Sequence, residues 1–253
     1  MELFYRTYGE GKPFVILHGL FGFSDNWNSM AKKISEYFFV ITVDLRNHGH
    51  SPWSEDFSYE LMAEDLKELF DSLKLEQAIV MGHSMGGKTA ITFYSLFPDL
   101  VERLIVVDMG IKAYPPHHTH ILQAIDAVNL DSIKTRREAE GILKKKIDSF
   151  GIIQFLLKNL HWLDKEKLAW RMNIDVLKRR MNEILKKIEL SNVPIPTLFI
   201  IGEYSNYVPE EDIPELESIF LDAKFQTIDN AGHWVHAENP NDFLLTVLAF
   251  SLR

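Results

Sequence analysis

Gly82-His83-Ser84-Met85-Gly86 stands directly after the apolar run 78–81 and directly before a helical run, residues 87–93. A serine with glycines two positions away on each side, between a strand and a helix, is typical of a sharp turn. Such a turn strains the serine and exposes its hydroxyl. The dipole at the start of the following helix favours negative charge beside that hydroxyl. The motif therefore predicts that Ser84 is a nucleophile. The alternative interpretation is a glycine-rich turn with an incidental serine, because the pattern alone also occurs by chance.

Short apolar runs rich in Val, Ile and Phe lie on both sides of this turn. They cover residues 14–17, 38–43, 78–81, 104–107, 197–201 and 225–228. Helical patterns separate several of them. One helix is expected at residues 59–73, with Ser58 placed to cap it, and a last helix is expected from Pro240, with Asn239 as its N-cap. Continuous apolar strands alternating with helices predict an α/β fold with a parallel sheet that is buried on both faces.

The strand pattern stops between residues 112 and 192, where the helical stretches 138–150 and 164–188 are dense in Lys, Arg, Glu and Leu. The simplest account is one α/β core, residues 1–111 and 193–253, interrupted by a helical cap at residues 112–192. We expect this cap to act as a lid whose apolar face covers the pocket. Two or more strands in the segment would contradict that expectation.

Composition excludes several classes of protein. The chain has 253 residues, of which 46% are hydrophobic, and no cysteine, so disulfide scaffolds and thiol catalysis are excluded. The net charge of −9 argues against a nucleic-acid partner, and we interpret Lys144-Lys145-Lys146 as a solvated helix face. No apolar run is long enough for membrane insertion. The first six residues resemble a strand rather than a signal peptide, so we expect a cytoplasmic protein.

A histidine near the carboxyl end is the candidate general base. Asn230-Ala231-Gly232-His233-Trp234 follows the last apolar run. An imidazole titrates close to neutral pH and can take the proton of a serine hydroxyl. The order of Ser84 before His233 matches the order of serine and histidine in folds with this serine turn. His236 is a local competitor, which we expect to lie on the surface or behind His233.

A second glycine-rich turn, His18-Gly19-Leu20-Phe21-Gly22, follows the run at residues 14–17. Such a turn can aim a backbone N–H, here that of Leu20, at the point where a substrate oxygen becomes negative. The N–H of Met85, the residue after the nucleophile, is the second expected donor. Leu20 and Met85 are therefore the candidate oxyanion hole.

These motifs, in this order, resemble the α/β-hydrolase superfamily. Three further segments, Asp44 to Pro52, Gly86-Gly87-Lys88 and Gln154 to Leu160, are similar to a branch of small bacterial esterases with mitochondrial relatives. Esterase and acyl-CoA thioesterase activities are attributed to that branch. The resemblance implies an α/β-hydrolase fold: a mostly parallel central sheet flanked by helices, with a helical cap inserted after the sixth strand.

The acidic member of the site departs from the commoner superfamily pattern, Gly-x-x-Asp after the strand at residues 197–201. The chain has Gly202-Glu203-Tyr204-Ser205 there, so Ser205 stands at the expected Asp position. A serine cannot supply the charge that stabilises an imidazolium. Asp108, at the end of the run 104–107, is the alternative that the esterase branch implies. We expect Asp108 to bind His233, while Glu203 stays open as the other candidate and Asp108 could instead cap the next segment.

The predicted function is hydrolysis of esters or thioesters of small to medium acyl groups by Ser84, Asp108 and His233, with no cofactor. Pro115-Pro116-His117-His118-Thr119-His120 lacks carboxylate or cysteine partners at a recognised spacing, so we interpret it as a solvated loop and expect no metal. The expected partner is a small-molecule ester or thioester, and the oligomeric state stays open. The alternatives are a receptor-like member with slow turnover, a lactonase and a C–C bond hydrolase.

Overall fold

The computed structural model describes residues 1–116, 118–164 and 167–253. Its central sheet has seven strands in the order β1-β3-β2-β4-β5-β8-β9. β1 pairs with β3 in the antiparallel sense, and all other pairs in this sheet are parallel. The strands are β1 (Tyr5–Tyr8), β2 (Pro13–Leu17), β3 (Phe39–Val43), β4 (Ala78–His83), β5 (Val101–Val107), β8 (Val193–Gly202) and β9 (Phe220–Ile228). Each apolar run predicted to be a strand lies in this sheet.

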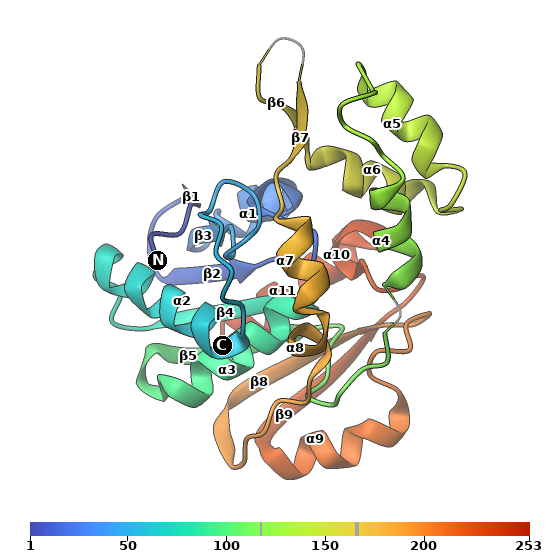
Figure 1. The fold of residues 1–253 in the computed structure, drawn as a ribbon. Coiled ribbons are helices and arrows are strands. Elements are labelled where there is room, and N and C mark those ends of the chain that lie inside the picture. Colours follow the sequence, from blue (N-terminus) through green and yellow to red (C-terminus); the bar gives the residue numbers. More distant parts are fainter. Residues whose placement is uncertain (117, 165–166) are drawn as a thin grey trace.

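Two apolar layers cover the sheet because alternate residues of each buried strand point to opposite faces. Val15 and Leu17 of β2 pack with α2 (Tyr59–Leu73) and α3 (Met85–Leu96), whereas Phe14 and Ile16 pack with α1 (Asn28–Ile34) and α11 (Pro240–Ser251). Figure 1 shows α2 and α3 together on one side of the sheet. The remaining core helices are η1 (Ser24–Trp27), η2 (Pro98–Leu100), η3 (Glu210–Asp212), α9 (Ile213–Ile219) and α10 (Val235–Glu238).

The helix caps lie where the sequence predicts them. The Ser58 side chain accepts a hydrogen bond from the N–H of Leu61 at the start of α2. Asn239 does the same for the N–H of Asp242 at the start of α11, where Pro240 is the first helical residue. Each side chain satisfies an N–H group that has no partner inside its helix.

The segment between β5 and β8 is helical with one exception. It contains α4 (Thr119–Asp126), α5 (Arg136–Leu143), α6 (Phe150–Lys158), β6 (Leu160–Trp162), β7 (Leu168–Trp170), α7 (Ile174–Arg179) and α8 (Met181–Leu185). β6 and β7 form a separate antiparallel pair, which projects at the top of Figure 1. The expectation of no strand in residues 112–192 is therefore wrong, and so is the purely helical lid that depended on it.

The predicted helix at residues 164–188 is broken into β7, α7 and α8, and its residues 165–166 lie outside the described part of the chain. The insertion follows β5, the fifth strand, so the expected count of six preceding strands is one too high. The N-terminal residues supply a single edge strand, β1, before β2. Among the described residues, no helix combines the length and the apolar character needed to cross a membrane.

Candidate active site

Ser84 lies at the sharp turn between β4 and α3. Its backbone has φ 54° and ψ −121°, and its N–H donates to the carbonyl of Val107 at 3.0 Å. The two flanking glycines are required by close contacts. A Cβ on Gly82 would lie 2.0 Å from the carbonyl oxygen of Gly86, and one on Gly86 would lie 2.5 Å from that of Leu17. The strained serine turn predicted from the sequence is therefore present in the backbone.

Asp108 and His233 are brought together from the ends of β5 and β9. The Oδ2 atom of Asp108 lies 2.7 Å from Nδ1 of His233, within the expected range of about 2.6–3.2 Å. Asp108 is fully buried and has a positive φ of 49°. The exposed carboxylate of Glu203 instead accepts the N–H of Asn230 at 2.7 Å. Of the two candidate acids, Asp108 is the one that contacts His233.

Ser205 contacts the carboxylate that stands in for the missing Asp. Its hydroxyl donates to Oδ2 of Asp108 at 2.5 Å, and the N–H of Gly202 donates to Oδ1 at 3.0 Å. Burial raises the pKa of Asp108, and these two hydrogen bonds lower it. They therefore favour the charged carboxylate against the effect of burial. The sequence analysis treated Ser205 only as an absent acid; its position in the Gly-x-x-Asp pattern was the signal for this contact.

Two aromatic residues hold His233 in place, and neither role was predicted. His83, inside the serine motif, bonds through Nε2 to the carbonyl oxygen of His233 at 2.8 Å. Burial lowers the pKa of His83 to about 3, and the nearby His233 adds to this effect, so His83 is a neutral donor. Tyr207 stacks on the His233 ring with centroids 3.9 Å apart and planes 14° apart. Both contacts join residues that are not neighbours in the sequence, which a local pattern does not reveal.

Leu20 and Met85, the candidate oxyanion donors, lie after β2 and at the first residue of α3. Within the part of the chain that the structure describes, neither backbone N–H is donated to another protein atom. Leu20 and Ser84 line the same pocket. Two free N–H groups beside a strained serine can receive a negatively charged oxygen.

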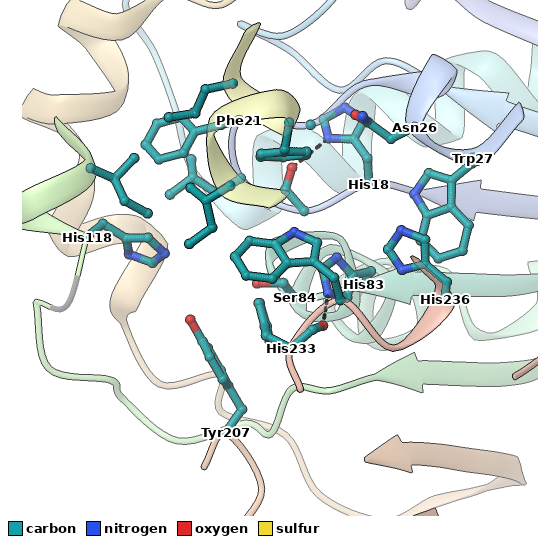
Figure 2. A pocket seen from close by; sticks show the side chains of 18 of the residues that line it. His18, Phe21, Asn26, Trp27, His83, Ser84, His118, Tyr207, His233 and His236 are labelled. Carbon is teal, nitrogen blue, oxygen red and sulfur yellow. Dashed lines mark hydrogen bonds between the residues drawn. The ribbon is translucent and has the colours of Figure 1, made fainter. Parts of the chain in front are cut away.

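Ser84 and His233 line one apolar cavity of about 200 Å³ beneath the helical segment (Figure 2). On one wall the ring of His236 stacks on that of Trp27, with centroids 4.0 Å apart. This competitor of His233 therefore packs in the pocket wall. Residues from α4, including His120, and from α6 line the cavity on the other side, together with His118. The solvated-loop interpretation is therefore incomplete for these two histidines; His117 lies outside the described residues. The α4 and α6 lining residues are His120, Ile121, Ile152, Phe155 and Leu156.

Comparison with known proteins agrees with this architecture. The sequence profile of the family described as "alpha/beta hydrolase fold" matches residues 12–149. The sn-1-specific diacylglycerol lipase ABHD11 of Mus musculus is 40% identical over 246 residues, covering 93% of this chain and 80% of that protein. Esterase YbfF of Escherichia coli K12 is 36% identical over 236 residues, covering 93% and 91%.

A solved structure titled "Marine microorganism esterase" has a TM-score of 0.95 and 43% sequence identity. The alignment covers 98% of this chain and 99% of that one. The resemblance inferred from the motifs is thus confirmed, and these relatives are named as esterases or a lipase. The chain belongs to the α/β-hydrolase family.

Proposed function

We propose that this protein is a serine hydrolase that cleaves carboxylic esters or thioesters of small to medium acyl groups through an acyl-enzyme. The observation that carries the proposal is the presence of a strained Ser84 and of His233, bonded to the buried Asp108, at one apolar pocket. The names of the relatives support the hydrolase class. The proposal of thioesters in addition to esters rests on the resemblance stated from the sequence.

In this mechanism His233 takes the proton of the Ser84 hydroxyl as its oxygen attacks the acyl carbon. Asp108, bonded to Nδ1, orients the ring so that Nε2 receives that proton, and it stabilises the imidazolium. The N–H groups of Leu20 and Met85 bind the oxygen that becomes negative. The protonated His233 then gives its proton to the leaving alcohol or thiol. Water, activated by the same histidine, hydrolyses the acyl-enzyme and restores Ser84.

The pocket supports an uncharged acyl group of limited size. No Lys, Arg, Asp or Glu is present among the described residues that line it, and its volume is about 200 Å³. Ligand pockets for drug-sized molecules are larger, about 300–1,000 Å³. We propose that residues 112–192, although not purely helical because they contain the β6–β7 pair, form a cap over this site, because α4 and α6 supply apolar side chains to it. The substrate is proposed to be a small molecule, and a cytoplasmic location stays a prediction.

The test is a rate comparison between wild type and Ser84→Ala on p-nitrophenyl esters and acyl-CoAs of increasing chain length. We expect wild type to turn over short and medium chains and Ser84→Ala to lose at least about a thousandfold in kcat. A circular dichroism melt checks that the variant is folded. A wild type that turns over none of these substrates, or a folded Ser84→Ala that keeps more than a few per cent of the rate, would contradict the proposal.

A further inference from the structure

The backbone of the loop that carries Leu20 is held from several sides. The carbonyl oxygen of Gly19 accepts hydrogen bonds from the N–H of Gly22 at 2.9 Å and from Nδ1 of His18 at 2.8 Å. That carbonyl belongs to the same peptide unit as the N–H of Leu20. Because the peptide unit is planar, fixing its oxygen on one side fixes the direction of its N–H on the other.

The next residue, Phe21, is held at both its N–H and its carbonyl. Its φ is 62°, a conformation that a bulky residue adopts only when its surroundings impose it. The N–H donates to Nε2 of His48 at 3.2 Å. The carbonyl accepts a hydrogen bond from Nδ2 of Asn159 at 2.8 Å. His48 belongs to the core, whereas Asn159 follows α6 of the inserted segment.

His48 is the fixed partner in this arrangement. Its Nδ1 bonds to the carbonyl oxygen of Arg46 at 2.9 Å and so carries the proton, which leaves Nε2 as the acceptor for Phe21. Burial lowers the pKa of His48 to about 3, and the neighbouring His18 acts in the same direction, so the ring is neutral in the native protein near pH 7. The core side of the clamp therefore does not change over the physiological pH range.

Asn159 is the partner that comes from the inserted segment. Its side chain is fully buried, and within the described residues its Oδ1 makes no hydrogen bond. The bond to Phe21 therefore supplies the hydrogen bond that this buried side-chain amide requires. Asn159 also ends α6, whose Ile152, Phe155 and Leu156 line the pocket, so a shift of α6 moves the donor that holds Phe21.

We propose that Asn159 is a positioning residue that couples the cap to the oxyanion hole: its amide holds the Phe21 carbonyl and thereby the direction of the Leu20 N–H. This inference rests on the hydrolase function proposed above. It predicts that the amide acts on the transition state more than on substrate binding, because the oxyanion forms only as the bond is attacked.

The test compares Asn159→Ala with a matched cap-to-core contact that involves no residue of the Leu20 loop. Asn173 donates through Nδ2 to Oδ1 of Asn47 at 3.1 Å and also caps α7, so Asn173→Ala loses at least as many contacts. With p-nitrophenyl acetate, Asn159→Ala should lower kcat by about tenfold to a hundredfold with KM changed less than about threefold. Binding of a boronic acid that mimics the tetrahedral intermediate should weaken in parallel. Asn173→Ala should keep kcat within about threefold of wild type.

A second variant keeps the test decisive if Asn159→Ala does not fold. Asn159→Leu fills a similar volume but cannot donate, and it should show the same fall in kcat. Equal losses in the Asn159 and Asn173 variants, or a raised KM with unchanged kcat, would overturn the coupling. Wild-type turnover separates the two proposals: if the wild type hydrolyses the ester and the Asn159 variants match it, only the coupling fails, whereas an inactive wild type contradicts the hydrolase function itself.

Discussion

Phe21, Ser84 and Asp108 have positive φ angles of 62°, 54° and 49°, and all three surround the candidate site. A non-glycine residue held in such a region costs of order 1–3 kcal/mol and persists only where its surroundings impose it. Each of the three donates its backbone N–H to a fixed acceptor: Nε2 of His48, the Val107 carbonyl and the Ile200 carbonyl, respectively. The strained backbone is therefore maintained by hydrogen bonds to two strands of the sheet and to one buried histidine.

The contact between Asp108 and His233 leads to a prediction that separates the two candidate acids. Asp108→Asn should lower kcat on an activated ester by about ten-thousandfold, because the amide no longer holds the imidazole in its productive tautomer. Glu203→Gln should change kcat less than about threefold, since Glu203 contacts the N–H of Asn230. Steady-state rates of the two purified variants check this. Comparable losses in both, or a loss confined to Glu203→Gln, would contradict the assignment of Asp108.

Strands and helices with a local signature are the elements that the sequence predicts well. The runs at residues 14–17 and 78–81 are fully buried strands, and α2 begins and ends at the predicted residues, Tyr59 and Leu73. β6 and β7 have three residues each and pair with one another. Strands this short depend on that pairing and are too short to show a periodic pattern in the sequence. Charged, Leu-rich sequence around them favours helix, which explains the error in that segment.

Lys88 joins both ends of the inserted segment to the core, as its two acceptors show. Its buried Nζ donates to the carbonyl of Lys112, where the chain leaves the core, at 2.8 Å, and to the carbonyl of Lys186, where the chain returns to it. The same Nζ lies 4.8 Å from the centroid of the Tyr114 ring. Lys88→Met keeps the aliphatic volume but leaves two carbonyls unpaired. We expect a loss of about 3 kcal/mol in the free energy of unfolding.

Urea unfolding of the Lys88 variant beside Lys187→Met provides the measurement. Lys187 is an exposed lysine paired with Glu215 on the surface, so its removal should leave the midpoint of urea unfolding close to that of the wild type. Equal and small effects of the two substitutions would show that Lys88 does not secure the segment.

The molecule gathers its candidate site at one edge of the sheet. Leu20 follows β2, Ser84 follows β4, Asp108 follows β5 and His233 follows β9. Because these strands are parallel, their carboxyl ends meet at the same edge, where open α/β sheets hold their sites. Motif order along the chain therefore predicted that Leu20, Ser84 and His233 assemble, whereas it left Glu203 open beside Asp108. The supporting contacts of Tyr207 and Asn159 were not predictable, because each depends on side chains that meet only in the folded chain, whereas the contact of Ser205 had a signal in its place in the Gly-x-x-Asp pattern.

Buried neutral histidines make the whole fold sensitive to acid. Burial lowers the pKa of His18, His48, His83 and His236 below the usual value of 6.5, to about 3 for His48 and His83. Between pH 6.5 and 3 the unfolded chain therefore binds more protons than the native one, and stability falls as the pH falls. Each such group contributes up to about 1.4 kcal/mol per pH unit. Asp108, whose pKa is raised by burial, acts with the opposite sign, but it is one group against four.

Urea unfolding at pH 7, 6 and 5 should therefore show a steadily decreasing unfolding free energy. His48→Gln, whose side chain can still accept the N–H of Phe21, should reduce the slope of the unfolding free energy against pH by the contribution of about one bound proton. An unfolding free energy that stays constant or rises from pH 7 to pH 5 would contradict this account of the buried histidines.

The most direct test of Ser84 as the nucleophile is covalent trapping followed by peptide mass spectrometry. An alkyl fluorophosphonate reacts with an activated serine by forming an oxygen–phosphorus bond and releasing fluoride, with the serine proton passing to the base. We predict one adduct on the peptide that contains Ser84, loss of ester hydrolysis in step with labelling, and no adduct on Ser84→Ala. A protein that hydrolyses esters yet carries its adduct on another residue, or keeps full activity after Ser84 is labelled, would contradict the mechanism.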